Sequence, residues 1–201
     1  MKSTFKDSTM QHARRHFCSL LAGLTFCCAL GAAHAADAPQ VSLKTSMGEI
    51  VLELYPEKAP KSVVNFLQYV KNGHYNGTIF HRVIEDFMIQ GGGFDQKLQQ
   101  KPTGAPIENE AKNGLKNATY SIAMARTSAP HSATAQFFIN TNNNRPLDYP
   151  SQDGWGYAVF GKVIKGTEIV DKIKTVSVSD QNMHQHVPVK AVVIESATLI
   201  R

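Results

Sequence analysis

Cysteine is almost absent from this chain of 201 residues. The three that occur, Cys18, Cys27 and Cys28, all lie within the first 35 residues, so the segment 36–201 has none. That absence excludes a disulfide framework, a thiol nucleophile and a cysteine-ligated zinc site from residues 36–201. No serine stands in a Gly-x-Ser-x-Gly pattern, which argues against a small hydrolase as the alternative function.

Net charge is also small outside the N-terminal segment. The whole chain carries a formal charge of +5, and residues 1–35 hold four basic residues against a single acidic one. Their surplus of three leaves only +2 for the remaining residues. Nucleic-acid binding calls for a concentrated basic face, so we expect no nucleic-acid partner.

Long hydrophobic runs are missing, with one exception near the N-terminus. Arg14 and Arg15 precede an apolar run over 17–33, and Ala33-His34-Ala35 places small residues at the two positions that a signal peptidase recognises. This order predicts a secretory signal peptide, 1–35, that is cleaved after Ala35. A retained membrane anchor is the alternative, although the run contains polar residues and glycines and is shorter than the roughly 20 apolar residues of a spanning helix.

The segment 36–201 has no internal repeat and is of a length that suits one globular domain. We expect a short linker over 36–40 and one domain over 41–201. Alternation of apolar and polar residues predicts strands, and apolar spacings of three and four predict helices. The expected strands are 41–45, 49–54, 78–84, 88–90, 120–124, 136–140, 158–162 and 191–200, and the expected helices are 60–70 and 167–173.

Many short strands with few helices predict a mainly β fold, either an antiparallel barrel or a sandwich. One helix comes early and the other late in the chain, so that they suit the two open ends of a barrel. The run Gly91-Gly92-Gly93 is not followed by the Lys-Ser/Thr pair of a phosphate-binding loop, and we interpret it as a sharp turn with positive φ. His184-x-His186 has no obvious third ligand, so we expect loop histidines and no metal site.

Two stretches concentrate side chains that suit a binding site. In 80–93, alternate residues of a strand-turn-strand segment share a face, so Arg82, Met88 and Gln90 are expected on one surface. The second stretch runs from Ser121 to Asn140 and adds aromatic and polar groups. His81 lies in the first stretch as well, and we expect it to be a hydrogen-bonded core residue without a catalytic role.

Both stretches resemble the signature regions of the cyclophilins, a family of peptidyl-prolyl cis/trans isomerases. The elements Phe-His-Arg-Val-Ile (80–84), Phe-Met-Ile-Gln-Gly-Gly (87–92), Gln-Phe-Phe-Ile (136–139) and Gly-Tyr-Ala-Val-Phe-Gly-Lys-Val (156–163) stand in family order. The likeness runs from Val41 to Ile200, and Gly93 and Tyr157 are similar to the bacterial secreted branch. The resemblance implies a closed antiparallel eight-stranded β-barrel capped by two α-helices.

The resemblance also implies a role for each residue of the site. Arg82 matches the catalytic arginine, and Gln90 matches the amide that holds the substrate backbone. The other matches are to substrate-binding positions: proline-pocket walls at Phe87, Met88, Phe138 and Leu147, a second amide at Gln136, a backbone contact at Ala125 and the pocket rim at Tyr157. The implied substrates are proline-containing segments of unfolded or partly folded exported proteins, met in the periplasm by a monomer without cofactor or metal.

The chain departs from the family pattern in two places. Glu85-Asp86 stands where the family usually has Pro-Gly, and Pro146 stands where animal members carry tryptophan. The first change adds two acidic groups near the pocket, and the second removes an indole that tight cyclosporin binding uses. Two alternatives remain at this point: Arg82 as a structural ion-pair partner only, and a proline-peptide receptor or chaperone that does not accelerate isomerisation.

Overall fold

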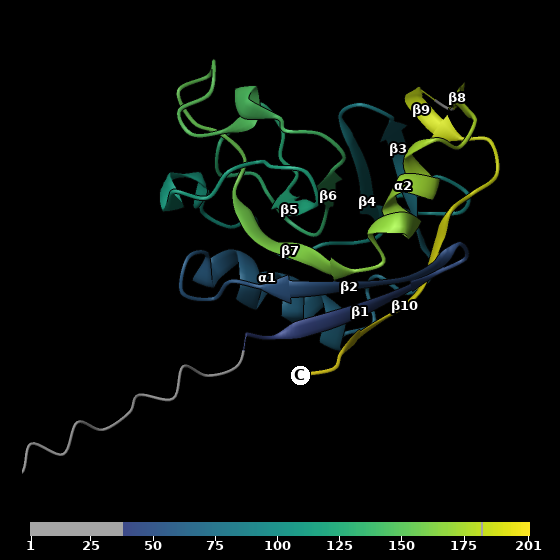
Figure 1. Ribbon diagram of the computed structural model, residues 1–201, viewed down its shortest axis with the longest axis horizontal. Helices are drawn as coiled ribbons and strands as arrows, with labels where there is room; N and C mark the ends of the chain where they lie inside the picture. Colours follow the sequence, from purple (N-terminus) through teal and green to yellow (C-terminus); the bar gives the residue numbers. More distant parts are fainter. Residues whose placement is uncertain (1–37, 182) are drawn as a thin grey trace, which may run out of the picture. The chain divides into compact units, whose positions relative to one another are not determined.

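The computed structural model describes residues 38–181 and 183–201 (Figure 1). The predicted signal peptide, 1–35, lies outside the described residues, as do the first two residues of the predicted linker. The first strand begins at Gln40, the last residue of that linker. Within the described part of the chain, no helix has the length and apolar character needed to cross a membrane.

Eight strands form one closed barrel in which every neighbouring pair is antiparallel, in the order β1-β10-β3-β4-β6-β5-β7-β2. The predicted barrel is therefore confirmed, and the sandwich alternative is wrong. The strands are β1 (Gln40–Thr45), β2 (Gly48–Leu54), β3 (Thr78–Ile84), β4 (Met88–Asp95), β5 (Ser121–Met124), β6 (Phe137–Asn140), β7 (Val159–Lys165) and β10 (Val193–Leu199).

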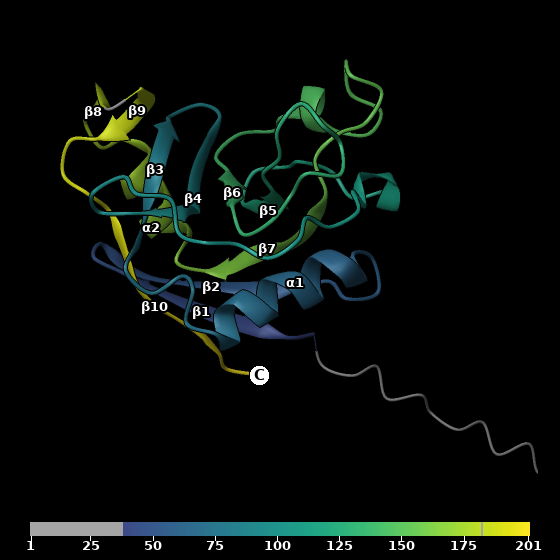
Figure 2. The ribbon, with the colours of Figure 1, turned by 180° about the vertical axis from the view of Figure 1, so that it is seen from behind.

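Two α-helices close the barrel, α1 (Pro60–Lys71) and α2 (Thr167–Lys174). Pro60 suits the first turn of α1. The N–H groups of that turn have no carbonyl partner within the helix, so proline, which has no N–H, costs no hydrogen bond there. Each helix buries one apolar stripe against the barrel interior, with Phe66 in α1 and Val170 in α2 fully buried. α2 lies in front of the barrel in Figure 1 and α1 lies in front in Figure 2, the view from behind.

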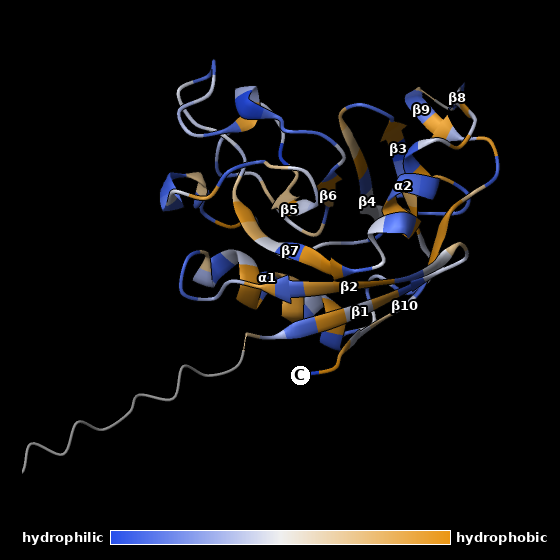
Figure 3. Ribbon diagram, in the orientation of Figure 1, coloured by the Kyte–Doolittle hydropathy of each residue, from blue (hydrophilic) through white to orange (hydrophobic). Residues whose placement is uncertain are grey.

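The barrel interior is the main hydrophobic core. Apolar and polar residues alternate along the strands (Figure 3), so that one set of side chains points inward. Phe66 and Phe137 meet edge to face at a ring separation of 5.6 Å, and Phe80 and Phe160 belong to the same buried cluster. This packing fixes the strands that carry the site on their opposite face.

The strand β4 is longer than predicted because the three glycines continue it. Gly92 has a φ of +84°, but it lies within β4 and the expected sharp turn is wrong. A Cβ at Gly92 would lie 2.8 Å from the Tyr75 ring and 3.0 Å from the Phe137 ring. The glycine therefore allows the backbone of β4 to approach the aromatic core closely.

A second sheet of two strands, β8 (Val178–Gln181) and β9 (His184–Pro188), was not predicted. Most of its side chains are exposed, so the segment lacks the alternating burial that marks a strand in sequence. His184 and His186 lie in β9, and the expectation that they are loop histidines is wrong. Among the described residues, no group of three or more histidine, cysteine or acidic side chains is arranged to hold a metal ion.

Candidate active site

The candidate site lies on the outer wall of the barrel, across β3, β4 and β6. Arg82 of β3 is paired with Gln90 of β4, and Gln90 is paired with Phe138 of β6. Residues paired directly across neighbouring strands project from the same face of a sheet. Phe137, the residue before Phe138, is fully buried in the barrel interior, so this row of side chains projects outward.

A β-bulge turns Arg82 toward this outer face. Phe80 is paired with Gly91 and Arg82 is paired with Gln90, so that His81 is an extra residue on β3. In a regular strand Phe80 and Arg82 would share a face, yet Phe80 is buried in the interior cluster. The extra residue shifts the alternation by one, and bulges commonly redirect side chains beside active sites in this way.

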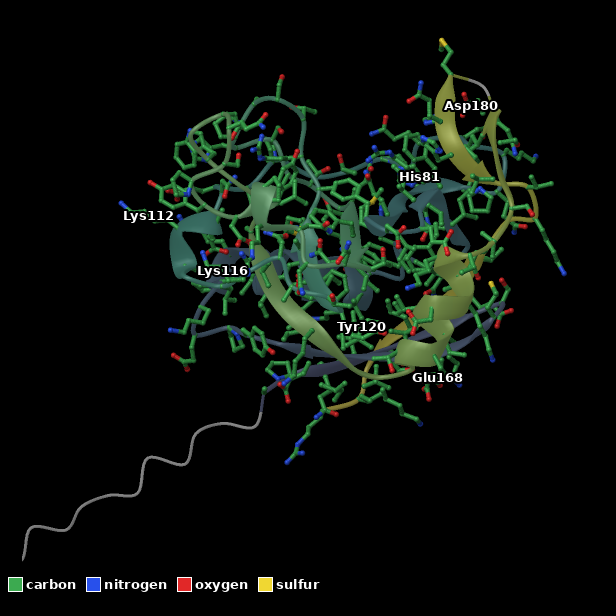
Figure 4. The ribbon with its side chains drawn as sticks, turned by 45° about the horizontal axis from the view of Figure 1, so that its top comes forward. His81, Lys112, Lys116, Tyr120, Glu168 and Asp180 are labelled. Carbon is green, nitrogen blue, oxygen red and sulfur yellow. The ribbon has the colours of Figure 1, made fainter. Side chains whose placement is uncertain are left out.

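The bulged residue His81 is 4% exposed, which agrees with the expectation of a core residue. Its ring packs on Phe94 at 4.6 Å and on His184 of β9 at 6.2 Å, and Figure 4 shows it beside the hairpin that carries Asp180. The Nδ1 atom has no hydrogen-bond partner among the described residues, so the expected hydrogen bonding is not found at this nitrogen. Burial lowers the pKa of His81 to about 4, and electrostatic interactions with His184 and Arg82 act in the same direction.

The outward row borders a hollow of ≈ 260 Å³ on the barrel wall. Seven of the nine predicted site residues line it, together with one that was not predicted, Arg126. The lining residues are Arg82, Phe87, Met88, Gln90, Arg126, Phe138, Leu147 and Tyr157. Their apolar members form a second hydrophobic cluster, separate from the barrel interior.

The two remaining predicted residues adjoin the hollow. The Gln90 side chain donates a hydrogen bond to the Gln136 side chain at 2.9 Å, which fixes the two amides against one another. A Cβ at Gly93 would lie 2.5 Å from the Gln136 Cγ, so only glycine leaves room for this arrangement. Ala125 belongs to the apolar cluster of the hollow, and its backbone N–H donates to the Gln136 carbonyl at 3.0 Å.

Arg82 is half-buried at the edge of the hollow. Within residues 38–181 and 183–201 its guanidinium forms neither a hydrogen bond nor an ion pair. The alternative of a structural ion-pair partner therefore has no support in the described part of the chain. An arginine carries five N–H donors and stays charged, so its donors remain available to a bound acceptor.

The walls on the far side of the hollow come from the loops between β6 and β7. Leu147 belongs to the short 3₁₀ helix η2 (Arg145–Leu147), and Tyr157 lies just before β7. The Tyr157 ring packs edge to face on Phe138 at 5.6 Å. Pro146 is exposed and does not line the hollow, so Leu147 and Tyr157 form the wall without an indole.

Arg126 is the site residue that sequence reasoning missed. Its guanidinium carbon lies 4.4 Å from the centre of the Tyr157 ring, and its side chain is only 2% exposed. A signal was present, because Arg126 directly follows the apolar run 122–125. A charged residue at a strand end is usually solvated, however, and nothing in the spacing indicates burial.

The turn between β3 and β4 carries the two acidic residues that depart from the family pattern. Glu85 and Asp86 are exposed, next to the wall residue Phe87. Thr141 holds the turn: its hydroxyl donates to the Glu85 carbonyl at 2.7 Å and its backbone N–H donates to the Phe87 carbonyl at 3.0 Å. The acidic side chains therefore stand at the rim of the hollow and not inside it.

A closed eight-stranded barrel with two helices, and with an arginine beside a hollow with apolar walls, is the arrangement that the sequence resemblance implied. The family model described as cyclophilin type peptidyl-prolyl cis-trans isomerase matches residues 40–199. The chain belongs to this family and is a peptidyl-prolyl cis-trans isomerase.

Individual relatives agree with this assignment. The chain is 61% identical to "Peptidyl-prolyl cis-trans isomerase cyp18" of Streptomyces antibioticus, over 80% of this chain and 98% of the relative. It is 54% identical to "Peptidyl-prolyl cis-trans isomerase B" of Escherichia coli, over 79% and 98%. A crystal structure of a cyclophilin type peptidyl-prolyl cis-trans isomerase from Cryptosporidium parvum matches with a TM-score of 0.68 at 27% identity, covering 82% of this chain and 98% of that one.

Proposed function

We propose that the hollow binds the proline ring of an X–Pro segment and that Arg82 accelerates rotation about the preceding peptide bond. That rotation has a barrier of ~18–20 kcal/mol because the C–N bond is partly double. In the twisted transition state conjugation is lost, and the prolyl nitrogen becomes a hydrogen-bond acceptor. A guanidinium that donates to this nitrogen stabilises the twisted form more than either planar form, which is the requirement for catalysis.

The other residues of the site receive binding roles in this proposal. The ring would lie among four apolar walls, while the Gln90 amide, fixed by Gln136, holds the peptide backbone on the Arg82 side. Ala125 would contact the peptide through its backbone, and Tyr157 would form the rim. The four apolar walls are Phe87, Met88, Phe138 and Leu147.

One observation carries the proposal: a half-buried arginine without an internal partner borders a hollow with apolar walls. A pure proline-peptide receptor would need the hollow but not an unpaired, permanently charged donor beside it. Further support comes from a Cryptosporidium parvum relative of the same fold, crystallised in the presence of the dipeptide Ala-Pro, with a TM-score of 0.66 at 27% identity.

The decisive experiment measures cis/trans exchange of an Ala-Pro peptide with residues 36–201 and with the Arg82→Ala variant. We expect strong acceleration by the parent and a loss of roughly tenfold or more in the variant, or about 1.4 kcal/mol. Arg145→Ala is a matched control, because Arg145 is exposed and does not line the hollow. An Arg82→Ala variant as fast as the parent would remove Arg82 from the reaction, and a folded parent without acceleration would leave a receptor as the better account.

We also propose that the substrates are exported proteins, whose folding this isomerase assists in the periplasm. The support is the sequence of residues 1–35, with its basic, apolar and small-residue segments in order. Mass spectrometry of the protein from fractionated cells tests this proposal. A periplasmic chain that begins at Ala36 is expected, and an uncleaved chain confined to the cytosol would contradict it.

A further inference from the structure

Arg126 stands out in this fold because it is a charged side chain that the protein buries almost completely. The side chain is 2% exposed, and its position two residues after the end of β5 brings it against the loop between η2 and β7. Burial of a charge is costly unless it is paired and hydrogen-bonded. The partners of Arg126 therefore indicate what the burial achieves.

The first partner is the peptide unit that joins Gly156 to Tyr157. The Arg126 Nε donates to the Gly156 carbonyl at 3.0 Å, and the Asn109 side chain donates to the same oxygen at 2.9 Å. The N–H of this peptide unit, on Tyr157, donates to the Leu147 carbonyl at 2.9 Å. One peptide unit thus connects Arg126 with both far walls of the hollow, Leu147 and Tyr157.

The second partner is Asp153, in the loop that leads to this peptide unit. A terminal nitrogen of Arg126 forms an ion pair with the Asp153 carboxylate, which also accepts from the Ser151 hydroxyl at 2.6 Å and from the Trp155 N–H at 3.0 Å. These hydrogen bonds, that of Ser151 first and that of Arg126 second, lower the pKa of Asp153 to about 2. The carboxylate is therefore charged at every physiological pH.

The third contact is with the Tyr157 ring itself. The guanidinium lies over the ring, with its carbon 4.4 Å from the ring centre, and the ring packs on Phe138 on the floor of the hollow. A flat guanidinium can stack on an aromatic face and donate sideways in its own plane at the same time. The compact ammonium of a lysine offers no such combination.

We propose that Arg126 is a positioning residue that fastens the 148–157 loop to the end of β5 and so holds Leu147 and Tyr157 in place as walls of the hollow. The inference rests on the proposed function, in which this hollow holds the proline ring. Arg126 acts through Tyr157 and Gly156, whereas Arg82 acts on the rotating bond. The two arginines of the hollow therefore have different roles, and kinetics separates them.

The walls hold the proline ring in the planar and in the twisted state alike. A loosened wall weakens binding of both states equally, which raises KM and leaves kcat unchanged. For Arg126→Ala we expect KM for an Ala-Pro peptide to rise about tenfold with kcat within about twofold of the parent. Arg126→Lys retains the charge without the planar fork, so it should recover about a third of the lost affinity or less.

Trp155 provides a spectroscopic readout of the loop. It is the single tryptophan of the chain, its backbone N–H donates a hydrogen bond to the Asp153 carboxylate, and its ring packs on His131 at 4.7 Å. Release of the loop in Arg126→Ala is expected to increase quenching of its fluorescence by acrylamide. Arg145→Ala, which removes an exposed arginine from the same region, should leave both the quenching and KM at the values of the parent.

Asp153→Asn keeps the proposal testable if Arg126→Ala fails to fold, because it leaves the Arg126 side chain in place and an amide oxygen can still accept its hydrogen bond. We expect smaller changes in the same direction: KM should rise about threefold, kcat should stay close to that of the parent, and quenching of the tryptophan fluorescence should increase. Unchanged KM and unchanged quenching in the folded variants would overturn the proposal. A fall in kcat at constant KM would overturn it too, because Arg126 would then act on the transition state.

Arg82→Ala, measured in parallel, separates failure of this inference from failure of the proposed function. If Arg82→Ala slows exchange while the Arg126 variants resemble the parent, the positioning role alone is wrong. If Arg82→Ala exchanges as fast as the parent, Arg82 has no part in the reaction and the proposed function fails, whatever the Arg126 variants show.

Discussion

Phe137 and Phe138 are neighbours on β6, and they belong to two different parts of the protein. Phe137 is fully buried in the barrel interior, where its ring meets Phe66 and Tyr75 edge to face at 5.6 and 5.5 Å. Phe138 is 4% exposed and belongs to the outer cluster around the hollow. One strand therefore carries the core on one face and the candidate site on the other.

The two faces of β6 show how the barrel combines stability with binding. The interior cluster is large, aromatic and aliphatic, and it fixes the positions of the strands. The outer cluster is small, and cations and amides stand at its border. Because the strands are rigid, side chains on their outer face keep their spacing without a dense core of their own, which leaves room for a ligand.

The largest effect is expected on the interior side. Phe137→Ala removes a ring from a closely packed cluster and leaves a cavity that the barrel cannot close. We expect the free energy of unfolding to fall by about 3–5 kcal/mol. Urea denaturation measures this, and a loss below about 1 kcal/mol would show that the interior rearranges freely around the missing ring.

The second prediction concerns His81, which lies between the two regions at the bulge. In the folded protein its pKa is lowered to about 4, while an unfolded histidine binds its proton near 6.5. Between these values the unfolded state holds more protons, so stability is full above pH 6.5 and falls as the pH decreases to about 4. The loss reaches up to about 3 kcal/mol, because each tenfold difference in proton affinity between the two states corresponds to about 1.4 kcal/mol.

Denaturation curves recorded between pH 7 and 4 test this prediction. His81→Phe removes the titrating group and keeps an aromatic ring against Phe94, so this part of the pH dependence should disappear. His186→Asn changes an exposed histidine of β9 and should retain the slope of the parent. An identical slope in His81→Phe and the parent would contradict the assignment to His81.

The third prediction is the outer counterpart of the first. Phe138 borders a hollow that is already open on one side, so Phe138→Ala should destabilise the fold less than Phe137→Ala does. We expect the free energy of unfolding to fall by about 1–2 kcal/mol. The proposed wall is lost, and KM for an Ala-Pro peptide should rise about tenfold. If Phe138→Ala destabilised the fold as much as Phe137→Ala and left KM unchanged, the outer cluster would be a second core and not a binding site.

Much of the fold was predictable because the barrel strands are buried on at least one face. Alternation identified all eight strands, and apolar spacing identified both helices, with Pro60 marking the start of α1. The β8–β9 sheet was not predicted because its side chains are largely exposed on both faces. The predicted turn at the three glycines was wrong because glycine has two uses that look alike in sequence. It permits a sharp turn, and it also permits the close approach of a strand to the Tyr75 and Phe137 rings.

The candidate site was predictable where a short motif carries it and not where distant loops meet. Arg82, Phe87, Met88 and Gln90 lie within nine residues of sequence, and the structure gathers them around one hollow. Arg126 is different, because its burial depends on Gly156 and Asp153, about 30 residues further along the chain. Neither this contact nor the bulge at His81 leaves a periodic signal, since both arise from pairing between strands and loops.

The smallest effect is expected at the acidic rim. Glu85 and Asp86 are exposed beside Phe87, and neither forms an ion pair among the described residues. Their charge should favour peptides with a lysine near the proline over those with a glutamate, by about twofold to threefold in kcat/KM, since exposed charges interact weakly through water. The double variant Glu85→Gln, Asp86→Asn should abolish this preference.

High salt should abolish the preference in the parent as well, because the Debye length falls to about 3 Å at 1 M ionic strength. Glu168→Gln is the matched control: this exposed residue lies on α2 (Figure 4), outside the lining of the hollow. It should leave the preference unchanged. A preference for lysine that persists in the double variant and at high salt could not come from Glu85 and Asp86, and the acidic rim would then have no part in substrate choice. Arg82 and Arg126, the charged residues that line the hollow, would not explain it either, because their positive charge favours glutamate.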